Sequence, residues 1–126
     1  MIKVEVSALH TDLSSDLEKY AHKKFGRLEK YLPKSMRTSA HVEVRLKELK
    51  TKGQKQYVCD AVLHVPGENL AAEEATINIF AAIDIVERKL KTQLDKYRST
   101  HLRSLSSKRT KIRRLLNRFR SPSSDN

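Results

Sequence analysis

The single cysteine and the five histidines are the side chains of this 126-residue chain best suited to nucleophilic or metal chemistry. A thiolate beside an imidazole base is a common arrangement for covalent catalysis. Cys59, however, shares the phase of a predicted strand with Ala61 and Leu63. That phase predicts a buried thiol that packs as a small apolar side chain. We therefore predict a core residue at this position rather than a nucleophile.

The histidines lack the spacing of a metal-binding motif. No two of them are four residues apart, as in H-x-x-x-H. His41 and His64 fall on the polar faces of predicted strands, where a solvated imidazole is expected. The three glycines are too dispersed to build a phosphate-binding loop. The sequence therefore predicts no catalytic residue, no bound metal, no cofactor and no small-molecule substrate, and an enzyme is not supported.

The elements that position these residues follow from apolar periodicity. Alternating apolar residues predict strands in four segments, residues 2–6, 40–46, 57–65 and 70–72. Spacings of three and four predict amphipathic helices in two segments, residues 13–31 and 79–97. Thr11 or Asp12 is expected to cap the first helix, and Asn78 or Thr76 the second. Phe80 is expected in the buried stripe of the second helix.

This order, β-α-β-β-β-α, predicts one α/β (α+β) domain with two helices packed on one face of a four-stranded mixed sheet. Strands one and two can be parallel because a helix connects them. Strands two, three and four should form an antiparallel meander, with Pro66-Gly67 as its second turn.

Positive charge is concentrated near the end of the chain. Residues 1–97 carry 17 Lys/Arg against 14 Asp/Glu, and residues 98–126 carry 9 against 1. This asymmetry indicates a polyanionic partner, with nucleic acid ahead of an anionic membrane surface. We predict a domain over residues 1–98 and a basic, flexible tail over residues 99–126.

The tail carries an amphipathic pattern. In the segment SKRTKIRRLLNRFR, Ile112, Leu115, Leu116 and Phe119 have the spacing of one helical stripe. So short and so basic a segment is marginal as an isolated helix. We expect it to be mostly disordered in free solution and to fold against a partner. The basic residues expected to make the tail contacts are Lys111, Arg113, Arg114 and Arg118.

Basic residues also gather on the two predicted helices. They lie in the last turns of the first helix and along one stripe of the second, and together they could form a phosphate-binding ridge. The sheet lacks the aromatic-rich face of an RNA-recognition motif. Recognition of RNA shape and phosphates therefore fits better than readout of bases.

The segment CDAVLHVPGENLAAEEATINIFAAIDIVERKLKTQLDKY resembles the signature half of the ribosome hibernation promoting factor family, also known as ribosome-associated inhibitors or sigma-factor modulation proteins. The segment KKFGRLEKYL agrees more loosely, and the resemblance covers about residues 1–100. The matching positions are Asp60-Ala61, Pro66-Gly67, Ala81-Ala82-Ile83-Asp84, Lys89-Leu90, Gln93-Leu94 and Lys96.

The resemblance implies the fold predicted above and a translation inhibitor that binds the small ribosomal subunit. Family members occupy the path of mRNA and tRNA there and silence translation in stationary phase or stress. By position, the resemblance implies five rRNA-binding residues: Lys24, Arg27, Lys89, Lys96 and Arg98. Three positions depart from the family pattern, since Phe80 replaces a usual Tyr, Asn78 a usual Asp and Thr92 a frequent Arg. The basic tail is the largest departure from the short members of the family.

Two rival interpretations stay open. The chain could bind structured RNA in general, or its basic amphipathic tail could tether the domain to anionic lipid. No apolar run approaches the roughly 20 residues of a transmembrane helix, and the N-terminus lacks the apolar block of a signal peptide. We therefore expect a cytoplasmic protein that is monomeric off the ribosome.

Overall fold

The computed structural model describes the backbone of residues 2–120 and the side chains of residues 2–50 and 52–100. The chain divides into two units, residues 1–94 and 95–126. The elements follow the predicted order: β1 (Lys3–Leu9), α1 (Ser15–Gly26), the 3-10 helices η1 (Arg27–Tyr31) and η2 (Lys34–Met36), β2 (His41–Thr51), β3 (Gln54–Val65), β4 (Glu68–Thr76) and α2 (Ile79–Arg120).

The strands form one mixed sheet in the order β1-β2-β3-β4. β1 and β2 are parallel, with Val4 opposite Val42. β2, β3 and β4 form an antiparallel meander. This topology confirms the predicted fold, because the helical crossover permits a parallel pair and the short turns permit only antiparallel ones.

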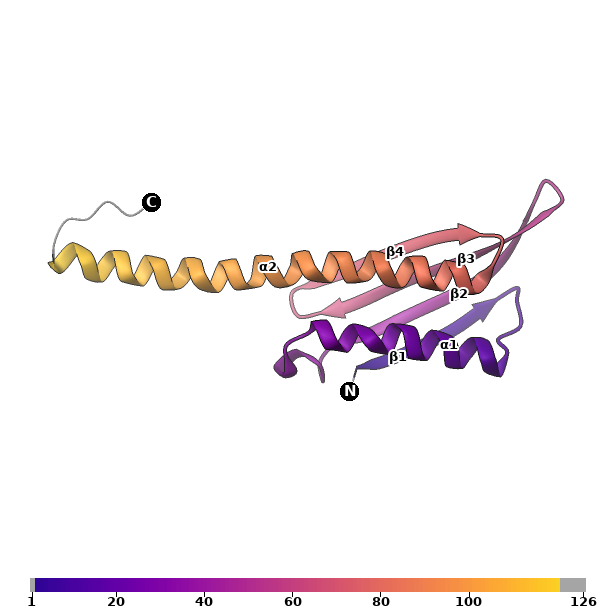
Figure 1. Cartoon of the computed structure of the whole chain (residues 1–126), viewed down its shortest axis with the longest axis horizontal. Helices are drawn as coiled ribbons and strands as arrows, with labels where there is room; N and C mark the ends of the chain where they lie inside the picture. Colours follow the sequence, from indigo (N-terminus) through magenta and orange to yellow (C-terminus); the bar gives the residue numbers. More distant parts are fainter. Residues whose placement is uncertain (1, 121–126) are drawn as a thin grey trace. The chain divides into compact units, whose positions relative to one another are not determined.

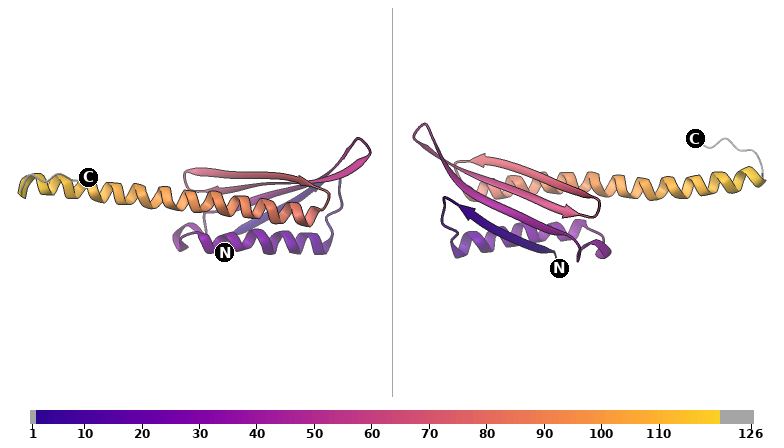
Figure 2. Two further views of the ribbon diagram at one scale, coloured as in Figure 1. Left: turned by 45° about the horizontal axis from the view of Figure 1, so that its top comes forward. Right: turned by 180° about the vertical axis from the view of Figure 1, so that it is seen from behind.

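Both helices of the first unit lie on one face of the sheet (Figures 1 and 2). The core is apolar throughout, and no polar or charged residue is buried in the described part of the chain. Val42, Val44 and Leu46 of β2 face the helices, whereas the alternate residues His41, Glu43 and Arg45 belong to the open face. The view from behind in Figure 2 shows this open face in front of the helices.

One predicted turn and one predicted cap are confirmed. Pro66-Gly67 joins β3 to β4, and Gly67 has a φ of 81°. Lys52 and Gly53 join β2 to β3 with φ of 53° and 78°, as a two-residue hairpin turn requires. Asn78 caps α2, since its Oδ1 accepts a hydrogen bond from the amide of Phe80 at 2.9 Å.

Three local predictions were wrong. The cap of α1 is Ser14, whose Oγ accepts from the amide of Leu17 at 3.1 Å, so the helix starts later than Thr11 or Asp12 would place it. Phe80 is 38% exposed because it lies at the margin of the helix pair, edge-on to Tyr20 at 5.0 Å. The second helix does not end near Tyr97, because α2 continues to Arg120.

Candidate nucleic-acid interface

The basic residues of α1 and η1 differ in how far they are free to meet a polyanion. The Nζ of Lys24 lies 3.3 Å from Oδ1 of Asp84 on α2, and 5.6 Å from the centre of the Tyr20 ring. Arg27 is exposed and forms no ion pair within the described part of the chain. Of these two predicted phosphate ligands, Arg27 therefore presents the more available charge.

Asp84 joins the two helices through a second contact. The hydroxyl of Tyr20 donates a hydrogen bond to Oδ1 of Asp84 at 2.5 Å. This hydrogen bond is the main reason that the pKa of Tyr20 is raised to about 12, with burial and the charge of Asp84 adding to it. Tyr20, Lys24 and Asp84 therefore form a polar clasp between α1 and α2.

Lys89 and Gln93 of α2 bind the outer strand of the sheet. The Nζ of Lys89 lies 2.5 Å from Oε2 of Glu74 and 3.1 Å from the carbonyl oxygen of Glu73. The side-chain amide of Gln93 donates to the carbonyl oxygen of Ala71 at 2.6 Å. β4 is an edge strand, so these carbonyls have no partner strand. Lys89 is thus engaged inside the fold as well as being a predicted rRNA ligand.

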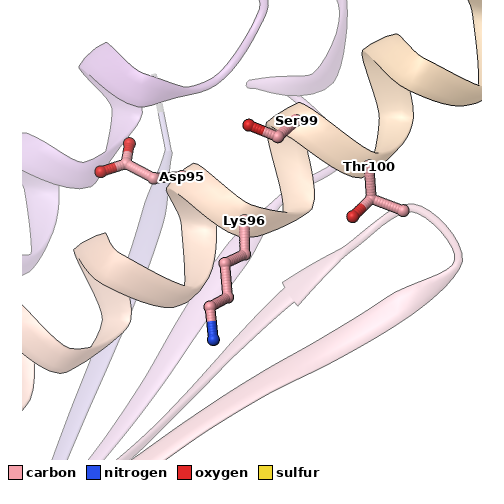
Figure 3. A pocket seen from close by; sticks show the side chains of 4 residues that line it. All are labelled: Asp95, Lys96, Ser99 and Thr100. Carbon is pink, nitrogen blue, oxygen red and sulfur yellow. The ribbon is translucent and has the colours of Figure 1, made fainter.

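Lys96 and Arg98 are exposed residues of α2 in the second unit, residues 95–126. Lys96 lines a shallow hollow with Asp95, Ser99 and Thr100, all from one stretch of the helix (Figure 3). Lys96 and Thr100 point to one side of the helix, and Asp95 and Ser99 point to the other. The ammonium group of Lys96 extends away from the helix (Figure 3).

The predicted tail contacts lie outside the residues whose side chains are described. The backbone of Lys111, Arg113, Arg114 and Arg118 belongs to α2. Their roles and the boundary near Arg98 stay predictions.

Lys24 of α1, Arg27 of η1 and Lys89 of α2 all belong to the first unit. Within this group Lys24 and Lys89 are already paired with carboxylates. A phosphate would have to compete with Asp84 and Glu74 for them, whereas Arg27 has no such competitor among the described residues. Of these three candidate ligands, Arg27 in η1 is therefore unpaired among the described residues, whereas Lys24 and Lys89 already have carboxylate partners.

The open face of the sheet carries further basic residues that sequence reasoning passed over. Arg45 and Lys47 line a hollow together with Ser7, Leu9 and Asp60. The alternating pattern of β2 could have revealed Arg45 and Lys47, because it places every second residue of that strand on one face. His41, Glu43 and His64 also meet on this face, although only the strand register reveals it.

Cys59 is buried, as predicted. Burial, with the neighbouring charge of Asp60, raises the pKa of its thiol to about 12. The thiol is therefore protonated at neutral pH, whereas a nucleophilic cysteine needs a lowered pKa.

The family described as Sigma 54 modulation protein / S30EA ribosomal protein matches the chain over residues 4–101. The chain belongs to this family. The match begins in β1 and ends within α2, so it takes in α1, the first part of α2 and nearly all of the sheet. Two curated relatives are each 27% identical over 99 residues, the ribosome hibernation promotion factors of Lactococcus lactis subsp. cremoris and Staphylococcus aureus. The alignments cover 79% of this chain, which spans about half the length of each relative.

Solved structures show the same fold. The Protein Y N-terminal domain of Thermus thermophilus has a TM-score of 0.62 at 21% identity, covering 76% of this chain and 97% of that one. A ribosomal subunit interface protein from Coxiella burnetii has a TM-score of 0.64 at 22% identity, covering 78% and 99%. Among the described residues of this chain, no helix has both the length and the apolar character needed to cross a membrane.

Proposed function

We propose that this chain is a hibernation factor that binds the small ribosomal subunit and blocks translation without performing chemistry. The observation that carries the proposal is the family match over residues 4–101, together with the names of the curated relatives. The fold supports it, since neighbours titled Protein Y and ribosomal subunit interface protein share it over nearly their whole length.

In this proposal the folded first unit fills the path of mRNA and tRNA, and cations on the two helices neutralise rRNA phosphates. Arg27, which begins η1 directly after α1, is the strongest candidate contact near that helix because it is exposed and has a planar guanidinium, which suits phosphate. Lys96 and Arg98 supply exposed charge on α2. Lys24 and Lys89 would contribute only after exchanging a carboxylate partner for a phosphate. We propose a cytoplasmic protein that is monomeric off the ribosome, and a basic tail that adds affinity to the site the folded domain selects.

Charge reversal at the two available cations tests the interface. The double variant Arg27→Glu/Lys96→Glu should bind purified small subunits more weakly, and its affinity should depend less steeply on salt concentration. If each side chain meets one phosphate, the slope of log K against log salt should fall by roughly 1.4–1.8. The measurement is pelleting of the full chain with small subunits over a series of salt concentrations.

The matched control reverses two cations away from the helices. Lys3 and Lys55 are exposed residues of β1 and β3, so Lys3→Glu/Lys55→Glu makes the same change in net charge. In the control, the slope of log K against log salt should change little. Equal losses in both variants would indicate a non-specific polyanion binder, and the interface on the helices would be wrong.

Competition tests the proposed location. Saturating mRNA and initiator tRNA should displace the protein from small subunits if it occupies their path. Undiminished binding to subunits that already hold both ligands would contradict the steric mechanism. Binding to liposomes of anionic lipid, without binding to ribosomes, would instead support a membrane tether.

A further inference from the structure

Two histidines and a glutamate meet on the open face of the sheet. His41 begins β2, and Glu43 follows two residues later on the same face. His64 lies directly opposite His41 in the antiparallel register of β2 and β3. One ligand atom from each of the three side chains lies within 4.8 Å of the other two.

The carboxylate of Glu43 lies near the spacing of a metal ligand from both imidazoles, beyond the usual hydrogen-bond distance. Oε1 of Glu43 lies 3.5 Å from Nε2 of His41 and 3.4 Å from Nε2 of His64. N–H···O hydrogen bonds are shorter, about 2.7–3.2 Å. Ligands bound to tetrahedral zinc at about 2.0–2.1 Å are about 3.3–3.4 Å apart, which is close to the 3.4 and 3.5 Å found here.

His64 is oriented as a ligand. Its Nδ1 lies 2.9 Å from Oδ1 of Asn69. An amide oxygen only accepts hydrogen bonds, so this contact requires the proton on Nδ1, and in the neutral ring Nε2 then keeps its lone pair. That Nε2 is buried and has no hydrogen-bond partner among the described residues. An outer partner that fixes the tautomer of a histidine is a usual companion of metal binding.

We propose that His41, Glu43 and His64 bind a divalent transition metal ion, with Asn69 as a positioning residue. Two imidazoles and one carboxylate suit Zn²⁺, and an all-oxygen set would be expected for Mg²⁺ or Ca²⁺. The side chains of His41 and Glu43 are 38% and 42% exposed, so water can complete the coordination and the ion can enter from solvent.

One adjustment is required. The two imidazole rings are stacked, with centres 4.3 Å apart and planes 15° apart. A metal ion lies near the plane of each ring that binds it, so the rings must tilt away from the stack. His41 is the more exposed of the two histidines and has room to turn, whereas Asn69 holds His64. The ion would fasten the start of β2 to the end of β3 and, through Asn69, to the start of β4.

The test is a zinc titration of the full chain without a histidine tag. Wild-type protein should bind one Zn²⁺ saturably, and its Tm in excess zinc should exceed its Tm in chelator, because an ion that binds only the folded state stabilises it. Loss of the outer-shell partner in Asn69→Ala should weaken zinc binding by roughly 10–100-fold. Loss of a ligand should weaken it at least as much, in each of the variants His41→Gln, Glu43→Gln and His64→Gln. Circular dichroism in chelator checks that every variant is folded.

His22→Gln is the matched control, because His22 is an exposed histidine of α1 that also lies near a carboxylate, 3.8 Å from Glu18. It should leave zinc binding unchanged. Nitrogen NMR of the five imidazoles should show zinc shifting Nε2 of His41 and His64 only. Absent or non-saturable binding in the wild type, or equal weakening by His22→Gln, would overturn the proposal. Ribosome binding has a separate readout, so its failure would not affect this result.

Discussion

At the scale of single residues, Asp84 pairs with a lysine that was predicted to bind RNA. Its Oδ1 accepts a hydrogen bond from the Tyr20 hydroxyl and lies 3.3 Å from the ammonium nitrogen of Lys24. All three side chains keep some solvent exposure, so the ion pair alone contributes little stability. The hydrogen bond from a neutral phenol to a carboxylate is the stronger of the two contacts.

Removing the phenol tests the clasp. Tyr20→Phe should lower the free energy of unfolding by about 1–2 kcal/mol at pH 7, because a hydrogen bond to a charged acceptor is lost. In the wild type the pKa of Tyr20 is about 12 in the folded state, against 10.0 for an ordinary tyrosine. The folded state holds this proton more tightly, so the contribution is complete below pH 10.0 and disappears as the pH rises toward 12.

The measurement is urea denaturation of both proteins at neutral and alkaline pH, with tyrosinate absorbance as a second readout. The variant should lose a late titration step, because the pKa of Tyr20 is raised to about 12. Tyr57→Phe, which removes a half-buried phenol from β3, should leave that late step in place. An unaltered titration curve in Tyr20→Phe would contradict the assignment.

The sequence shows which residues are basic but not which of them have partners within the fold. The family resemblance implied Lys24 and Lys89 as rRNA-binding residues, and both have partners within the fold. Those partners are 60 and 15 residues away along the chain, beyond the reach of helical periodicity. Asp84 was within reach of Arg88 one turn later, yet it pairs with Lys24 because α1 packs beside α2. His41 and His64 were assigned to solvent for the same reason, since only the strand register brings them together.

At the scale of elements, α2 covers the outer edge of β4. Exposed edge strands invite pairing with a second chain, and proteins block them with charges or covering elements. Lys89 and Gln93, one helical turn apart, bind the carbonyls of Glu73 and Ala71, two residues apart on β4. Four residues of a helix and two residues of a strand both span about 6–7 Å. Side chains one turn apart on the helix can therefore reach alternate carbonyls of the strand.

Removing both contacts should expose the edge. Lys89→Met/Gln93→Leu keeps the apolar stems but leaves the two carbonyls without side-chain donors. We expect faster amide exchange in β4 and more self-association on heating, with a loss of about 1 kcal/mol in the free energy of unfolding. Hydrogen exchange and light scattering measure these effects.

The matched control is Arg88→Met/Thr92→Leu, one position earlier on the helix, where both side chains are exposed. It should leave the protection of β4 unchanged. Faster exchange in β4 for both double variants would mean that the edge depends on helix stability rather than on these donors.

Two glycines should respond to alanine in opposite directions. Gly67 has a φ of 81° in the turn between β3 and β4, a conformation that costs a residue with a Cβ roughly 1–2 kcal/mol. Gly26 has a φ of −62° between α1 and η1, and a Cβ there would meet no atom within 4 Å. Gly67→Ala should therefore destabilise, and Gly26→Ala should stabilise by about 0.4–1 kcal/mol through the unfolded state. Urea denaturation of the pair checks both signs, and a loss of stability in Gly26→Ala would contradict the second.

The elements themselves were largely predictable from sequence. Alternation gave the four strands, and Asn78 and Pro66-Gly67 marked a cap and a turn at the correct places. The start of α1 was placed too early because Thr11, Asp12 and Ser14 are all good capping residues, and only packing chooses among them. The predicted end of the second helix followed the loss of apolar residues after Tyr97. That loss limits what a helix can bury but does not end it, since residues 98–120 contain neither Pro nor Gly.

At the scale of the whole molecule, charge and fold are distributed differently along the chain. The family match ends at residue 101, whereas most of the excess positive charge lies in residues 98–126, with 9 Lys/Arg against 1 Asp/Glu. A folded domain with little net charge can select a site by shape, and a strongly basic segment adds affinity that depends on salt. The two parts should therefore be separable by experiment.

Deleting residues 99–126 makes that separation and removes eight basic residues. If about half of them meet phosphates, the slope of log K against log salt should become shallower by roughly 3 to 4, at about 0.7–0.9 per contact. Binding near physiological salt should fall, while competition by mRNA and tRNA should stay the same because the folded domain is intact. Salt-titrated pelleting with purified small subunits compares the two proteins, and circular dichroism checks that the shortened one is folded. An identical slope would mean that the tail does not touch the ribosome, and its basic amphipathic pattern would then point to a lipid surface or a protein partner.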